Sequence, residues 1–174
     1  AHPDVVAIRR DLHAHPELSF EENRTAAKVC EYLDKWGIHY QSGIAKTGVV
    51  ALIEGRNPSK KTIALRADMD ALPIHELNDV DFRSQNEGVM HACGHDVHTA
   101  SVLGTAFILS QIKDSFEGTV KLLFQPSEEK LPGGASVMIE EGVLQNPSPS
   151  AIYGQHVYPD LPVGKVGFRP GMYM

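Results

Sequence analysis

Cysteine is scarce in this sequence, and the two that occur, Cys30 and Cys93, are too few for a disulfide framework. This scarcity excludes a small extracellular domain held together by disulfides, and we expect a cytoplasmic protein in a reducing compartment. Cys30 lies in an apolar helical pattern, which indicates a buried structural residue. Cys93 lies among histidines instead, and its surroundings suggest a different role.

Long apolar runs and an excess of basic residues are also missing. No stretch of eighteen apolar residues occurs, so we expect no transmembrane helix. The first residues show neither the basic nor the apolar segment of a signal peptide. The formal net charge is -6, whereas a nucleic-acid surface needs clustered lysine and arginine. We therefore expect neither a membrane nor a nucleic acid as a partner.

The chain has 174 residues, 42% of them hydrophobic, which is enough for one packed domain. Apolar periodicity and turn residues predict helices over residues 5–12, 22–36, 99–112 and 133–141. The same signals predict strands over residues 48–53, 61–69, 118–124, 151–157 and 165–169. Strands that alternate with helices indicate an α/β fold with a mostly parallel central sheet flanked by helices.

The stretch from Met90 to His98 holds three histidines, one cysteine and one aspartate. Thiolate and imidazole are the ligands that zinc-like ions prefer, and the step Cys93-Gly94-His95 lets one tight turn present both side chains. A loop with surface histidines and a buried structural cysteine is the alternative. That alternative is favoured for any one of these histidines, but not for the whole cluster.

Two nearby features favour structural roles. Asp96 is placed to cap the helix that follows, and this role competes with metal binding. His13 and His15 lie two residues apart and cannot share a helix face, so capping and packing are favoured for them.

Carboxylates and a histidine follow three of the predicted strands. They are Asp68 and Asp70, Glu128 and Glu129, and His156. Because the carboxyl ends of strands in such sheets converge on one crevice, we expect these side chains near the Cys93 turn. A solvated strand end is the alternative for the Asp68 segment taken alone.

Four of these residues supply ligands of S, N, O and N type: Cys93, His95, Glu129 and His156. They are enough for one metal ion or for part of a two-ion site. Adjacent residues in extended chain point in opposite directions. Glu128 and Glu129 can therefore split their roles, one binding metal and the other facing the substrate as a base that takes a proton from a metal-activated water.

Five ordered segments resemble a known family. They resemble the amidohydrolase branch of the aminoacylase/glutamate-carboxypeptidase superfamily of metallopeptidases, which includes hippurate hydrolases, auxin-amino acid conjugate hydrolases and N-acetyldiaminopimelate deacetylases. The resemblance covers nearly the whole chain. The segments are Arg9–Glu17, Leu65–Pro73, Met90–His98, Phe124–Glu129 and Gly154–Val157.

The resemblance implies a site for two divalent ions (zinc, manganese, cobalt or nickel) and a zinc-exopeptidase-like catalytic domain. Its ligands are Cys93, His95, Glu129 and His156, with Glu128 as the catalytic base. Asp70 matches the aspartate that orients a ligand. Peptidase branches carry a ligand histidine where this chain has Asp68, which favours the amidohydrolase branch and leaves the role of Asp68 open.

The resemblance also implies that residues 1–174 are the N-terminal part of the catalytic domain. Family members continue into a lid domain, often used for dimerisation, and then return to the catalytic domain with a further histidine ligand. We expect the parent protein to hydrolyse the amide bond of N-acyl amino acids whose acyl group is acetyl, benzoyl or similar. We expect these 174 residues alone to be inactive and to hold one ion weakly or none. An aminopeptidase or dipeptidase, and an inactive metal-binding fragment, are the alternatives.

Overall fold

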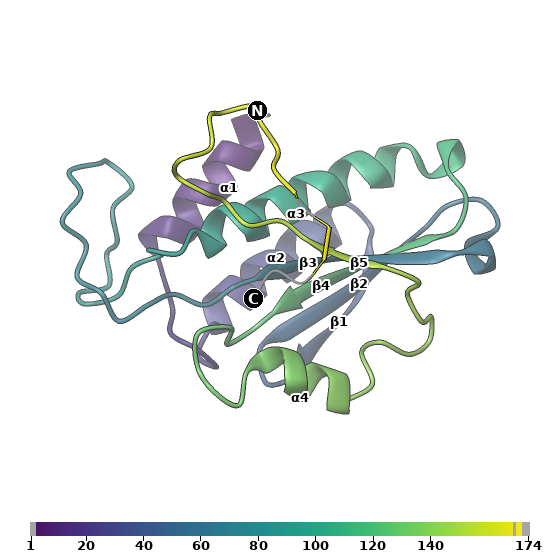
Figure 1. Ribbon diagram of the computed structural model, residues 1–174, viewed down its shortest axis with the longest axis horizontal. Helices are drawn as coiled ribbons and strands as arrows, with labels where there is room; N and C mark the ends of the chain where they lie inside the picture. The colour runs from purple at the N-terminus through teal and green to yellow at the C-terminus, as the bar shows by residue number, and fades with distance from the viewer. Residues whose placement is uncertain (1–2, 169, 172–174) are drawn as a thin grey trace.

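The computed structural model describes residues 3–168 and 170–171, and these build one mixed sheet with α-helices on both of its faces (Figure 1). The five strands have the order β1-β2-β4-β3-β5. Their bounds are His39–Ile44 for β1, Gly48–Glu54 for β2, Thr62–Asp68 for β3, Thr119–Gln125 for β4 and Ile152–Gly154 for β5. The predicted α/β class with a central sheet flanked by helices is confirmed.

The pairing of the strands is mixed rather than mostly parallel as predicted. β3 runs parallel to both β4 and β5, whereas β2 is antiparallel to β1 and to β4. Asp68 pairs in register with Gln125, and Arg66 pairs with Gly154. The three parallel strands therefore end at the same edge of the sheet, where the acidic segments and His156 follow.

Helices cover both faces of the sheet. α1 (Pro3–Ala14), α2 (Asn23–Lys35) and α3 (His95–Gln111) share one apolar core with the sheet, and α4 (Gly134–Glu140) belongs to a second core. In β4, Leu122 and Phe124 belong to the first core and Leu123 to the second, because successive strand residues face opposite sides. All seven residues of β4 are buried, as expected for a central strand. Short 3-10 helices occupy Pro58–Lys60 (η1) and Lys113–Ser115 (η2).

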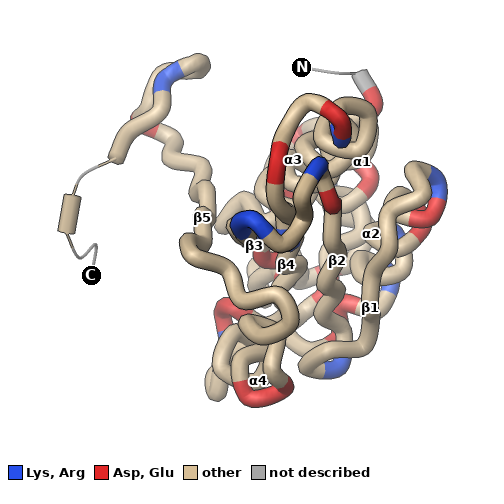
Figure 2. Tube along the Cα trace, turned by 90° about the vertical axis from the view of Figure 1, so that its right-hand side faces the viewer, with Lys and Arg blue, Asp and Glu red and all other residues tan. Residues whose placement is uncertain are grey.

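Two of the predicted strands differ from the structure. The predicted strand 151–157 is shortened to β5, so His156 lies beyond its end. Residues 165–168 of the predicted strand 165–169 form no strand, and Arg169 lies outside the described residues. Val166 and Phe168 are exposed there, and Figure 2 shows the chain after β5 leading away from the body of the fold. Without a packing surface, their apolar pattern forms no strand.

The edge strand β1 was not predicted. Its sequence, His-Tyr-Gln-Ser-Gly-Ile, has no regular apolar alternation, and only Ile44 in it is buried. Pairing with the apolar strand β2 therefore holds it in the sheet. Among the described residues, no helix is long and apolar enough to cross a membrane.

Candidate metal centre

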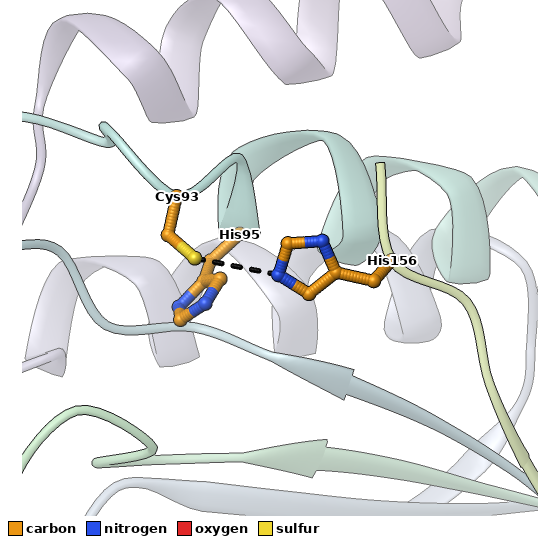
Figure 3. A group of neighbouring side chains, drawn as sticks. All are labelled: Cys93, His95 and His156. Carbon is orange, nitrogen blue, oxygen red and sulfur yellow. Dashed lines mark hydrogen bonds between the residues drawn. The ribbon is translucent and has the colours of Figure 1, made fainter. Parts of the chain in front are cut away.

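Cys93, His95 and His156 meet at the carboxyl edge of the parallel strands. Figure 3 shows Cys93 on the loop before α3, His95 in the first turn of α3, and His156 on the segment after β5. The Cys93 Sγ lies 3.3 Å from the His156 Nε2. One donor atom of each of the three side chains lies within 4.8 Å of the other two. The sequence prediction that these residues share one site is consistent with this geometry.

Among the described residues, three groups of side chains are close enough to hold an ion, and His95 belongs to each of them. The second group adds Asp68 and His98 to it, and the third adds Glu128 and Glu129. The His95 Nδ1 donates to the backbone oxygen of Asp70 at 2.8 Å and lies 3.3 Å from the Asp70 Oδ1. This bond fixes the ring proton on Nδ1 and leaves a lone pair on Nε2.

The His95 Nε2 is buried and makes no hydrogen bond to any described residue. Its nearest anionic atoms, the Asp68 Oδ2 and the Glu129 Oε1, both lie 3.7 Å away. A buried polar atom without a hydrogen bond is costly unless something else satisfies it. A divalent cation would do so here, because the surrounding donors are thiol, imidazole and carboxylate.

His156 has the same proton arrangement as His95. Its Nδ1 donates to the Val157 backbone oxygen at 2.7 Å, so the lone pair of its Nε2 faces Cys93 and accepts from the thiol at 3.3 Å. Gly94 lets this segment approach: its φ is +90°, and a Cβ there would lie 2.4 Å from the Val157 Cγ2. Glycine between Cys93 and His95 therefore serves both the turn and the close contact.

Asp70 is the acidic residue that ties these parts together. Its Oδ2 accepts from the Ser19 hydroxyl at 2.7 Å and from the Glu129 backbone N–H at 3.0 Å. Although burial opposes ionisation, hydrogen bonds from His95, Ser19 and the amides of Glu128 and Glu129 hold the pKa of Asp70 well below its usual range. Asp70 is therefore an ionised carboxylate that contacts His95 and the loop that carries Glu129.

Asp68 and His98 satisfy each other. The Asp68 Oδ1 accepts from the His98 Nδ1 at 2.6 Å, and its Oδ2 accepts from Arg66 at 2.6 Å. The His98 Nε2 accepts from the Val157 N–H at 3.0 Å. Both nitrogens of His98 are engaged, so its ring connects β3 to the segment that carries His156.

Glu128 and Glu129 follow β4 in a bend rather than in extended chain. The alternation expected for extended chain does not apply to them, and one oxygen of each carboxylate lies within 4.8 Å of a nitrogen of His95. The different roles predicted for the two carboxylates therefore cannot be explained by side chains that point in opposite directions.

The charge around Cys93 favours a cation. Burial, together with the carboxylates of Glu129, Asp68 and Glu128, raises the pKa of the Cys93 thiol to about 11. A divalent ion at the thiol would reverse this field, since metal binding stabilises the thiolate and balances the carboxylates. The donor set thus fits a divalent metal.

Asp96 and His13, near the site, contact other charged side chains. Asp96 lies inside the first turn of α3, whose N-cap is Gly94, so the predicted capping role of Asp96 is wrong. It pairs instead with Arg9 at 2.8 Å and with the His13 Nδ1 at 2.7 Å. The His13 Nε2 lies 3.0 Å from Glu76, so this buried ring contacts two carboxylates. Sequence reasoning missed these partners and also Ser19, since no local pattern connects them.

Known proteins resemble this chain over nearly its full length. A sequence profile described as Peptidase family M20/M25/M40 matches residues 64–173. An N-acyl-L-amino acid amidohydrolase of Geobacillus stearothermophilus is 49% identical over 171 residues, covering 98% of this chain and 45% of that protein. An N-acetylcysteine deacetylase of Bacillus subtilis is 48% identical over 174 residues, covering 99% of this chain and 45% of that protein.

A solved structure also matches closely. The Bacillus subtilis YXEP protein, a dinuclear metal binding peptidase from the M20 family, superposes with a TM-score of 0.92 at 48% identity. The match covers 98% of this chain and 47% of that one. The chain spans less than half the length of each of these relatives.

Proposed function

The chain belongs to Peptidase family M20/M25/M40, and from this we propose that the whole protein is a metal-dependent amidohydrolase of N-acyl amino acids. The relatives named for hydrolysing N-acyl amino acids support this substrate class. The activity is proposed for the whole protein because the chain spans less than half of their length.

Cys93, His95, Glu129 and His156 are the proposed ligands of two divalent ions per complete site, drawn from zinc, manganese, cobalt and nickel. The buried Nε2 of His95 carries this proposal, because it has a free lone pair and no hydrogen bond among the described residues. Thiolate favours zinc, whereas imidazole and carboxylate also accept the other three metals. The dinuclear metal binding of the YXEP protein supports the number of ions.

Glu128 is the proposed base. When bound, a divalent ion supplies a water molecule of lowered pKa and polarises the amide carbonyl. Glu128 would be the base that takes a proton from the water attacking the amide carbonyl, and it would pass this proton to the amide nitrogen as the C–N bond breaks. The closeness of its carboxylate to His95 and Glu129 supports this assignment. Asp70 holds His95 in the required tautomer and fixes the Glu129 amide.

A peptidase acting on free dipeptides is a second candidate, because the YXEP protein is named a peptidase. Asp68 counts against it. The resemblance implies that peptidase branches carry a metal-binding histidine at this position, whereas both oxygens of Asp68 are hydrogen-bonded to His98 and Arg66. Hydrolysis of hippurate compared with that of a dipeptide separates the two. An inactive metal-binding protein would cleave neither substrate.

Glu128→Gln in the whole protein tests the proposed base. We expect kcat for an N-acyl amino acid to fall by roughly 100- to 10,000-fold while the metal content stays unchanged. Glu140→Gln, on the exposed side of α4, is the matched control and should leave both unchanged. Near-normal turnover by Glu128→Gln would contradict the assignment of Glu128 as the base. Absence of bound metal in the unaltered protein would contradict the proposed metal site.

A further inference from the structure

Glu22 is a fully buried carboxylate that takes no part in the metal groups described above. Its Oε1 accepts from the backbone N–H of Phe20 at 2.9 Å and from that of Ser127 at 2.8 Å. Its Oε2 accepts from the Thr47 hydroxyl at 2.5 Å. One side chain therefore joins the start of α2, the loop between β1 and β2, and the loop after β4.

The contact with Ser127 is the one that reaches the site. Ser127 is fully buried and has a φ of +47°, a left-handed conformation that a residue other than glycine adopts only when its surroundings hold it. Its hydroxyl donates to the Lys130 backbone oxygen at 3.0 Å, so the loop closes on itself. The next two residues along the chain are Glu128 and Glu129.

Helix capping does not account for Glu22. Although Glu22 occupies the N-cap position of α2, its side chain caps no N–H of that helix. Glu17 does this instead, accepting from the N–H groups of Arg24 at 2.9 Å and Thr25 at 2.7 Å. The carboxylate of Glu22 is directed to the loop after β4.

We propose that Glu22 is a positioning residue that fixes the Ser127 backbone and so holds Glu128 and Glu129 against His95. The inference rests on the proposed roles of those two glutamates. Asp70 holds the Glu129 N–H at 3.0 Å, so two buried carboxylates anchor the loop at residues 127 and 129. The rest of the loop then has little freedom.

Two substitutions of Glu22 separate the effect of its side-chain length from the effect of its charge. Glutamine keeps the reach: its oxygen can accept both backbone N–H groups, while its amide nitrogen donates to the Thr47 oxygen, whose hydroxyl turns away. Aspartate keeps the charge but is one carbon–carbon bond, about 1.5 Å, shorter and does not reach Ser127. Aspartate is also favoured at an N-cap, so the Glu22→Asp variant should fold.

Hydrogen exchange of the metal-free whole protein provides the first test. In Glu22→Asp, we expect the amides of residues 127–129 to exchange roughly 10- to 100-fold faster, which matches the loss of one buried hydrogen bond to a charged acceptor. Glu22→Gln should stay close to the unaltered protein. Glu17→Asp is the matched control, and it should speed exchange at residues 24 and 25 but not at 127–129.

Cobalt titration of the same variants provides a second reading. Glu22→Asp should bind Co²⁺ about 10-fold more weakly, and Glu22→Gln should bind as the unaltered protein does. Equal exchange at 127–129 in Glu22→Asp and Glu17→Asp, or faster exchange in Glu22→Gln as well, would overturn the inference. If the unaltered protein bound no Co²⁺, the proposed metal site would fail, whereas exchange would still decide the role of Glu22.

Discussion

Replacing Asp70 by asparagine should weaken metal binding through His95. The Asp70 Oδ2 receives two donors, from Ser19 and from the Glu129 amide, so the asparagine oxygen should remain there. Its NH₂ group then occupies the Oδ1 position, 3.3 Å from the His95 Nδ1. Two donors would face each other, and the conflict favours moving the ring proton to Nε2, which removes the lone pair needed for metal.

The size of this effect is limited by a second contact. The Asp70 backbone oxygen still accepts from the His95 Nδ1 at 2.8 Å, and this bond opposes the proton shift. Loss of a partner that orients a metal ligand typically costs 10- to 100-fold in affinity, or about 1.4 to 2.7 kcal/mol. We expect Asp70→Asn to lie in this range.

Competition with a chromophoric chelator at fixed pH measures the affinity for Zn²⁺ directly. Ser19→Ala is the control, because it removes one hydrogen bond from the same carboxylate and keeps its charge. It should weaken Zn²⁺ binding less than Asp70→Asn. Circular dichroism of both variants checks that the fold is intact. Equal Zn²⁺ affinity of Asp70→Asn and the unaltered protein would refute the reasoning about the His95 tautomer.

Three further changes test the surroundings of the site by denaturant unfolding. The hydrogen bond to Asp96 raises the pKa of His13 above 6.5. Protonated His13 therefore stabilises the folded state fully below pH 6.5, and this stabilisation is lost as pH rises through the raised pKa. His13→Gln should therefore cost more free energy of unfolding at about pH 6 than at about pH 9, and an equal cost would contradict this. Gly94→Ala should destabilise the fold by more than about 1 kcal/mol, through its φ and the clash with Val157, and an unchanged midpoint would contradict it. Thr99→Val should cost about 1 kcal/mol by removing a buried hydroxyl bond to the last residue of β3, whereas a stabilised variant would argue against that bond.

The sequence predicted the elements whose apolar patterns determine where they pack. β2, β3 and β4 are apolar runs bounded by turn residues, and each was predicted within a few residues of its observed bounds. β1 was missed because its place in the sheet comes from pairing and not from its own pattern. The strand predicted at residues 165–169 is the reverse case. Its residues alternate between apolar and polar, but residues 165–168 form no strand.

The proposed ligands could be predicted because their side chains carry recognisable chemistry. Cys93, His95 and His156 lie together as expected, although their roles as ligands remain predictions. The residues that hold them were not predictable in the same way. Ser19 lies 51 residues from Asp70, and Glu22 lies 105 residues from Ser127. Such pairs depend on the fold bringing distant segments together, and no local spacing indicates them.

X-ray absorption at the zinc edge of the zinc-loaded whole protein tests the central claim most directly. The proposed ligand set predicts a sulfur at about 2.3 Å together with nitrogen and oxygen at about 2.0 to 2.2 Å. Cys93→Ser should remove the sulfur and leave the lighter atoms. A zinc shell of nitrogen and oxygen alone in the unaltered protein would contradict the assignment of Cys93, His95, Glu129 and His156 as the metal centre.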